Sequence, residues 1–233
     1  MVPLVHPEWA AAFPWLIQGT TQRPDDFALS TPGALDSWAR LRAATGCTAA
    51  VHARQPHGAS VGVRAPESAG LHLAADADGH VTRMPGAILG VTTADCVPVT
   101  LVAPEARTVG MIHAGWRGAA AGILDRGVDR LRSAFGVAAA DLHLHLGPSI
   151  CGDCYEVGPE VHAALGLAEP PGPTPIDLPE VLGRRAVELG IRAEAITRSG
   201  WCTLCTGRDL LYSHRGGDAG RQVGFVGLMV EGA

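Results

Sequence analysis

Three apolar stretches follow one another closely in the middle of the chain, and they constrain the fold more than any other feature. They cover residues 87–92, 97–102 and 108–112. Each is shorter than an average helix of about 11–12 residues and is bounded by turn-forming residues, which favours buried β-strands. The second and third stretches flank a short turn at residues 103–107, so they predict a hairpin.

Helical spacing of apolar residues predicts helices around these strands. Leu35, Trp38 and Leu41 recur at helical spacing within residues 34–45, and the following Gly46 is a typical end signal. Further helices are predicted over residues 119–135 and 178–189, and further strands over residues 48–54, 142–146 and 223–230. The proline-rich residues 1–32 and the partly acidic residues 64–80, which include Asp76 and Asp78, are expected to be irregular.

Helices mixed with hairpin strands predict an α/β fold of the mixed α+β kind. We expect one domain over residues 1–233, built as a layered sandwich of mixed sheets with flanking helices. A chain of 233 residues with 47% hydrophobic residues can bury a core of that size. A doubly wound nucleotide-binding fold is not expected, because the sequence has no Gly-rich dinucleotide or phosphate loop.

The charge balance argues against several classes of partner. There are 18 Lys and Arg against 23 Asp and Glu, a net charge of −5, and no Lys/Arg-rich block. Nucleic acid and anionic membranes are therefore not expected as partners. The sequence starts without a basic region followed by a long apolar run, and no stretch has the length and apolarity of a membrane span, so we expect a cytoplasmic protein.

Two of the predicted strands end beside candidate metal ligands. Cys96 lies between the first and second central strands, and His113 follows the third. His57, in the run Gln-Pro-His-Gly, completes a His/Cys/His set that suits zinc with one coordination position left open. Asp95 and Gln55 are candidates to orient the imidazoles. Taken singly, Cys96 could be an inert buried thiol and either histidine a structural residue.

Cationic residues suggest where an anion could bind. Arg117 lies beside the start of the helix predicted over residues 119–135, whose free N–H groups favour phosphate. Pairing of Arg117 with a carboxylate is an equal alternative. Arg215 and Arg221 could contact an anionic substrate or brace the C-terminal strand.

Four of the other five cysteines form two Cys-x-x-Cys pairs, Cys151 with Cys154 and Cys202 with Cys205. They could form a four-cysteine structural zinc site, or a group of neighbouring thiols that can oxidise to a disulfide. His143 and His145 alternate on one predicted strand, where packing is the alternative to metal binding.

Taken together, the motifs resemble the laccase-domain family, also known as YfiH-like proteins, polyphenol oxidases or multifunctional purine nucleoside phosphorylases. The resemblance covers the chain from about residue 50 to its end. It is carried by runs at residues 55–58, 92–98, 113–118, 147–150, 154–158, 202–205, 212–215 and 220–222. At the N-terminus, where relatives often have Arg, Gly-Gly and then Asn-Leu-Gly, only Arg23 and a later Leu remain.

The resemblance implies a cytoplasmic enzyme with a zinc ion held by His57, Cys96 and His113, which would be the catalytic centre. It also implies phosphorolysis of adenosine, inosine, guanosine and methylthioadenosine, and deamination of adenosine. The expected partners are therefore purine nucleosides and phosphate. Arg23, Gln55 and Arg117 are the candidate substrate contacts.

Other functions fit parts of the same pattern. Cys96 as nucleophile and His113 as base could form a metal-free cysteine hydrolase, or an amidase that edits cell-wall precursors. A multicopper oxidase needs about ten histidine ligands, many in His-x-His pairs, whereas this chain has 10 His in total and one such pair. A non-catalytic binding protein with a structural metal is the remaining alternative.

Overall fold

The computed structural model describes residues 3–230, whose strands form two large mixed sheets and one small one. The five-stranded sheet has the order β1 (Leu16–Thr20), β13 (Gln222–Leu228), β6 (Ala87–Thr93), β2 (Ala49–Ala53), β4 (Gly70–Ala74). The six-stranded sheet has the order β12 (Ile196–Arg198), β9 (His143–Leu146), β7 (Val97–Ala103), β8 (Thr108–Ala114), β5 (Gly79–Thr82), β3 (Val61–Val63). Strands β10 (Glu156–Val157) and β11 (Thr174–Pro175) pair by themselves.

The two large sheets pack face to face and share an apolar core. Leu89 and Val226 of the five-stranded sheet lie in one buried cluster with Val109 and Met111 of β8. Because helices cover the outer faces of both sheets, strands β6, β7, β8 and β13 are buried over almost their whole length. This explains why their sequences are continuously apolar rather than alternating.

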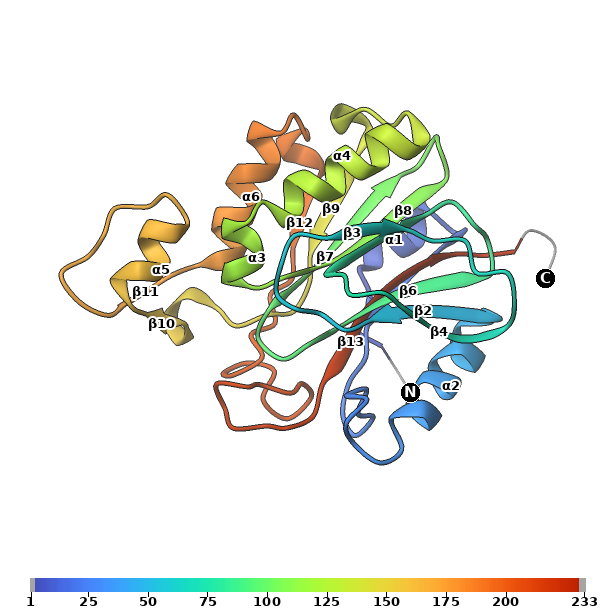
Figure 1. Cartoon of the computed structure of the whole chain (residues 1–233), viewed down its shortest axis with the longest axis horizontal. Coiled ribbons are helices and arrows are strands. Elements are labelled where there is room, and N and C mark those ends of the chain that lie inside the picture. Colours follow the sequence, from blue (N-terminus) through green and yellow to red (C-terminus); the bar gives the residue numbers. More distant parts are fainter. Residues whose placement is uncertain (1–2, 231–233) are drawn as a thin grey trace.

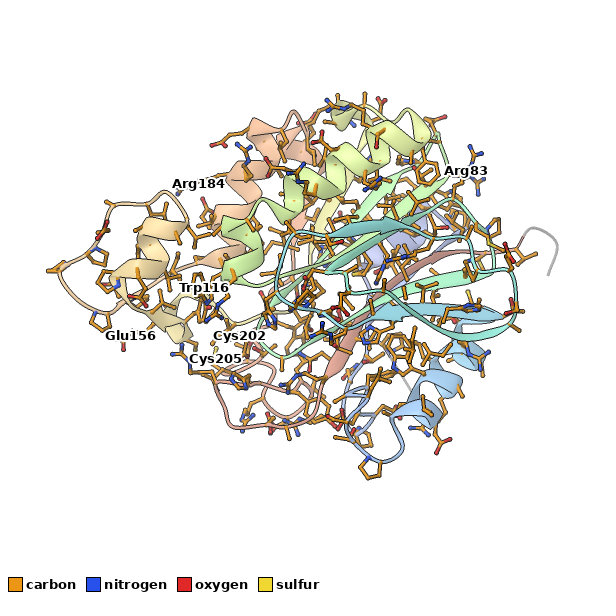
Figure 2. The ribbon with its side chains drawn as sticks, in the orientation of Figure 1. Arg83, Trp116, Glu156, Arg184, Cys202 and Cys205 are labelled. Carbon is orange, nitrogen blue, oxygen red and sulfur yellow. The ribbon has the colours of Figure 1, made fainter. Side chains whose placement is uncertain are left out.

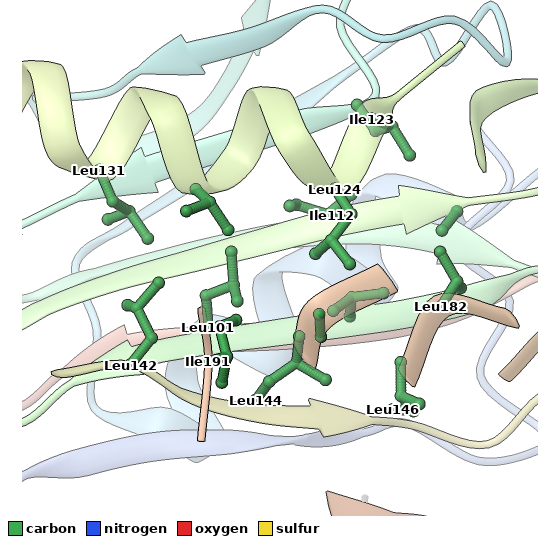
Figure 3. Packing of buried hydrophobic residues seen from close by; sticks show 14 of the residues in the cluster. Leu101, Ile112, Ile123, Leu124, Leu131, Leu142, Leu144, Leu146, Leu182 and Ile191 are labelled. Carbon is green, nitrogen blue, oxygen red and sulfur yellow. The ribbon is translucent and has the colours of Figure 1, made fainter. Parts of the chain in front are cut away.

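Helices cover the outer faces. Helix α2 (Ala34–Thr45) packs Trp38 and Leu41 on the five-stranded sheet, and α4 (Ile123–Phe135) and α6 (Leu178–Glu188) cover the six-stranded sheet (Figure 1). Figure 3 shows Leu124 and Leu131 of α4 packed above Leu101 and Ile112. Short helices complete the fold: α1 (Pro7–Ala12), α3 (Trp116–Ala120) and α5 (Pro159–Ala164).

These layers confirm the predicted α/β class, with mixed sheets and flanking helices. The central hairpin also forms: β7 and β8 pair antiparallel from Val97 with Ala114 to Ala103 with Thr108. Helix α2 ends at Gly46 in the left-handed conformation, as its sequence predicts.

Three expectations about local structure are wrong. Residues 1–32 hold α1 and β1, because Pro7 occupies a position at the start of a helix where proline is tolerated and β1 pairs with the distant β13. Residues 64–80 hold β4 and the first part of β5, since each gains a parallel or antiparallel partner far along the chain. The helix expected at 119–135 is divided into α3 and α4 by Gly122, which has a positive φ of 79°.

Within residues 3–230, no helix combines the length and the apolar character needed to cross a membrane.

Candidate metal centre

His57, Cys96 and His113 come together in the structure, although they are far apart along the chain. One ligand atom from each lies within 4.8 Å of the other two. The imidazole rings of His57 and His113 meet edge to face, with centroids 4.8 Å apart. His113 is buried, Cys96 is partly buried and His57 is exposed, so the cluster opens toward solvent on one side.

The hairpin register brings Cys96 and His113 together. Cys96 immediately precedes β7, and His113 on β8 is paired with Pro98 of β7. His57 lies in the loop after β2 with a positive φ of 63°. Gly115 leaves the room that this approach needs, because a Cβ there would lie 2.9 Å from the Cys96 sulfur.

Asp78 organises this cluster from within the core. Its fully buried carboxylate accepts hydrogen bonds from His113 Nδ1 (2.9 Å) and from the backbone N–H groups of His57 (3.0 Å) and Gly58 (2.7 Å). The bond to Nδ1 leaves Nε2 of His113 free to bind a metal. The sequence identifies Asp78 only as one of the acidic residues of an expected loop. Its position just before Gly79 and a short strand is the one feature that could have marked it as part of the site.

Asp95 and Gln55, expected to orient the imidazoles, direct their side chains elsewhere. Asp95 accepts hydrogen bonds from Thr203 Oγ1 (2.6 Å) and the Arg215 backbone N–H (2.7 Å). Gln55 exchanges hydrogen bonds with the backbone of Thr92, at 2.9 Å and 2.8 Å. Both residues therefore hold the loops around the cluster, while Asp78 takes the orienting role.

Contacts within the cluster favour an ionised thiol. Burial alone would raise the pKa of Cys96, but hydrogen bonds and Coulomb attraction from His113 and His57 lower that pKa to about 6. Burial alone would lower the pKa of His113, but the hydrogen bonds with Asp78 and Cys96 raise it to about 9. The thiolate is the form of cysteine that binds metals and acts as a nucleophile.

A cavity of about 670 Å³ adjoins the three candidate ligands. Apolar and cationic side chains both contribute to its wall. Its lining includes Leu29, His52, Arg54, Gln55, Leu73, His214 and Arg221, besides His57, Cys96 and His113. A cavity of this volume, lined by both apolar and polar side chains, suits a small organic molecule.

The other candidate substrate contacts differ in position. Gln55 lines the cavity. The Arg23 side chain pairs with Asp218 at 2.6 Å and stacks over Tyr212, and Arg117 lies over Trp116 with its guanidinium carbon 4.4 Å from the ring centroid. Neither arginine belongs to the described lining of this cavity. Arg221, one of the two C-terminal arginines singled out by the sequence, does belong to it.

Two further groups of candidate ligands have different settings. The sulfurs of Cys151, Cys154, Cys202 and Cys205 all lie within 4.8 Å of one another, so this cluster could hold a metal ion. His143 and His145 instead pack in an aromatic group with His6, Trp9 and Phe13. His145 also hydrogen-bonds Thr197 at 2.9 Å.

Comparisons with known proteins identify the family to which the sequence is similar. The family model described as multi-copper polyphenol oxidoreductase laccase matches residues 35–229. A protein from Deinococcus radiodurans named purine nucleoside phosphorylase is 38% identical over 205 residues, which cover 82% of this chain and 75% of that protein. A protein from an unknown prokaryotic organism, named as an adenosine deaminase, is 35% identical over 163 residues, covering 65% of this chain and 61% of its own length.

The overall fold is also shared with a solved structure. The crystal structure of YlmD from Geobacillus stearothermophilus has a TM-score of 0.86 and 26% sequence identity, and the match covers 94% of this chain and 93% of that one. In sequence, the alignments with four relatives named as purine nucleoside phosphorylases span 55–75% of each relative's length.

Proposed function

This chain belongs to the multi-copper polyphenol oxidoreductase laccase family, and we propose that it is a zinc-dependent purine nucleoside phosphorylase that also deaminates adenosine. The names of its relatives support both activities. The proposed substrates are adenosine, inosine, guanosine and methylthioadenosine, with inorganic phosphate as the second substrate of phosphorolysis.

The convergence of His57, Cys96 and His113 beside the cavity carries this proposal. Two imidazoles and one thiolate are a donor set that zinc accepts, and three protein ligands leave one position open for chemistry. The Asp78–His113 hydrogen bond is the carboxylate–histidine contact that usually accompanies a zinc-binding imidazole. Zinc held here would supply Lewis acidity next to the bound substrate.

The chain's own residues would bind and orient the nucleoside. Leu29 and Leu73 offer apolar surface for a purine, and Gln55 and the backbone it holds form part of the same wall. Arg221 and His214 are cationic or protonatable groups on the lining that could receive phosphate. Of the three substrate contacts expected from the sequence, we propose that Gln55 acts directly at this cavity.

The test is a product assay on purified protein together with its metal content. We expect zinc at the His57/Cys96/His113 site, and ribose 1-phosphate and free purine from nucleoside plus phosphate. Cys96→Ala should lose both that zinc and at least ~10²-fold in kcat/KM, since both depend on the same ligand. Cys47→Ala is the matched control, because Cys47 is a buried thiol outside the cluster.

The metal-free cysteine hydrolase, including a cell-wall amidase, would use the same Cys96 and His113 pair. It predicts activity that survives chelation and a reaction with peptide or amide substrates. Nucleoside turnover that persists without metal would refute the zinc proposal. Zinc binding without any nucleoside turnover would refute the substrate assignment and direct the search to cell-wall peptides, and copper in place of zinc would refute the metal assignment.

A further inference from the structure

The four cysteines of the two Cys-x-x-Cys pairs form a second cluster, separate from the His57 site. Their sulfurs lie within 4.8 Å of one another, and those of Cys151 and Cys205 are 3.8 Å apart. One pair follows β9, at the short turn Gly152–Cys154, and the other lies between β12 and β13. Cys202 and Cys205, whose sulfurs belong to this cluster, are labelled in Figure 2.

Backbone N–H groups stabilise the thiolate form of one cysteine of the cluster, Cys202. The Cys202 sulfur accepts hydrogen bonds from the backbone N–H groups of Cys151 (3.2 Å) and Leu204 (3.4 Å). Such donors stabilise the negative charge of a thiolate and direct its lone pairs. The two Cys-x-x-Cys pairs supply four sulfur ligands, and four ligands complete the coordination sphere of a tetrahedral metal ion. A closed sphere has no position for a substrate, so the chemistry indicates a structural site.

We propose that Cys151, Cys154, Cys202 and Cys205 bind a structural zinc ion, which joins the segment after β9 to the long segment between β12 and β13. This inference does not depend on nucleoside chemistry. The segment of residues 199–221 contains no helix or strand, and long irregular segments need other means of fixing their conformation. A metal ion that cross-links this segment to the one after β9 would fix its conformation.

The joined segments both contact the residue that precedes the active-site cysteine. Asp95 has a positive φ of 90° and receives hydrogen bonds from Ile150 N–H to its carbonyl and from Thr203 Oγ1 to its carboxylate. Ile150 directly precedes Cys151, and Thr203 directly follows Cys202. The four-cysteine zinc therefore fixes, through Asp95, the turn that presents Cys96.

The experiment measures the metal content of a variant of this chain from which the His57 site has been removed. In His57→Ala/Cys96→Ala, we expect one zinc per chain by native mass spectrometry. X-ray absorption should show four sulfur ligands at about 2.3 Å. Adding Cys205→Ser to this variant should reduce zinc occupancy at least tenfold in the presence of a competing chelator. Cys205 is exposed, so this substitution does not disturb the core. Adding Cys47→Ala instead should leave the zinc occupancy unchanged.

A second measurement uses the unaltered chain, so that a variant that fails to fold does not leave the question open. Alkylation followed by peptide mapping should show all four cysteines protected in zinc-loaded protein and modified after chelation. No zinc in His57→Ala/Cys96→Ala that retains native secondary structure would overturn the proposal. Bound iron, or a Cys151–Cys205 disulfide that forms equally with and without zinc, would overturn it as well.

Discussion

Asp78 is the residue on which the geometry of the His57 site depends most directly. It is fully buried, yet all the hydrogen bonds described for its carboxylate run to the His57–Gly58 backbone and to His113. A buried carboxylate without such donors would be costly, so the site and the carboxylate stabilise each other. The carboxylate also sets which imidazole nitrogen of His113 faces Cys96.

Replacing Asp78 with Asn tests this role. Asp78→Asn keeps the shape but loses acceptor capacity toward three N–H groups, so zinc affinity at the His57 site should fall about 10–100-fold. Competition with a chromogenic chelator measures this change. Asp76→Asn is the control, because Asp76 is an exposed neighbour that pairs with Arg54. Equal zinc affinity in both variants would contradict the assigned role.

His145 gives the stability a dependence on pH. Burial, and to a lesser degree the charge of His6, lower the pKa of His145 from 6.5 to about 3. Because the unfolded chain binds a proton at higher pH than the folded one, His145 contributes stability above pH 6.5, and that contribution declines as the pH falls from 6.5 toward 3. At pH 5 the loss in the free energy of unfolding is up to about 2 kcal/mol, because each pH unit below 6.5 costs ~1.4 kcal/mol.

Urea unfolding at pH 7 and pH 5 measures this contribution. His145→Gln removes the titrating group, so the variant should lose less unfolding free energy between the two pH values than the parent does. His72→Gln serves as the comparison, since His72 lies at the outer strand β4. An identical pH dependence in parent and His145→Gln would exclude His145 as a source of the acid sensitivity.

At the scale of elements, the contact of helix α2 with strand β6 depends on the glycine at position 90, which has no side chain. A Cβ at Gly90 would lie 2.5 Å from the Trp38 ring, and Trp38 is fully buried between Phe27 and His52. Interiors packed to this density respond to a single added methyl group. The strand can therefore bring its backbone against the indole only with glycine at this position.

Gly90→Ala should accordingly destabilise the fold by about 1–3 kcal/mol through overpacking. Chemical denaturation provides the measurement. Gly172→Ala is the matched control, because no atom lies within 4 Å of a Cβ built there. Equal stability of the two variants would show that α2 moves away without cost.

At the scale of the whole molecule, the proposed four-cysteine zinc would cross-link two segments that otherwise meet through the isolated backbone bridge between Ser149 and Cys202. Binding at a free zinc concentration 100-fold above Kd stabilises the folded chain by about 2.7 kcal/mol. For a chain of this size, chelation should then lower Tm by roughly 5–10 °C. Differential scanning calorimetry with and without chelator measures this shift.

The matched comparison is the His57→Ala/Cys96→Ala protein, whose remaining zinc is the structural one. Chelation should still lower its Tm, whereas a Cys151→Ser/Cys205→Ser protein should show a smaller effect. If chelation lowers Tm equally in both, the stabilisation does not come from the four-cysteine cluster.

The sequence alone determined the features that act over short distances. Apolar composition and turn residues predicted the β7–β8 hairpin, helix α2 and the α/β class, because these depend on local periodicity and caps. His57, Cys96 and His113 could also be named from the sequence as candidate ligands, because donor chemistry belongs to the residue itself.

Only the tertiary structure decided which distant groups meet. Asp78, rather than Asp95, reaches His113 because the pairing of β5 with β8 sets Gly79 opposite Ile112. Strands β1 and β4 form because remote partners accept their hydrogen bonds, which no local pattern records. The four cysteines likewise converge only because β9 and β12 pair side by side, so the segments after each strand leave the sheet at the same edge.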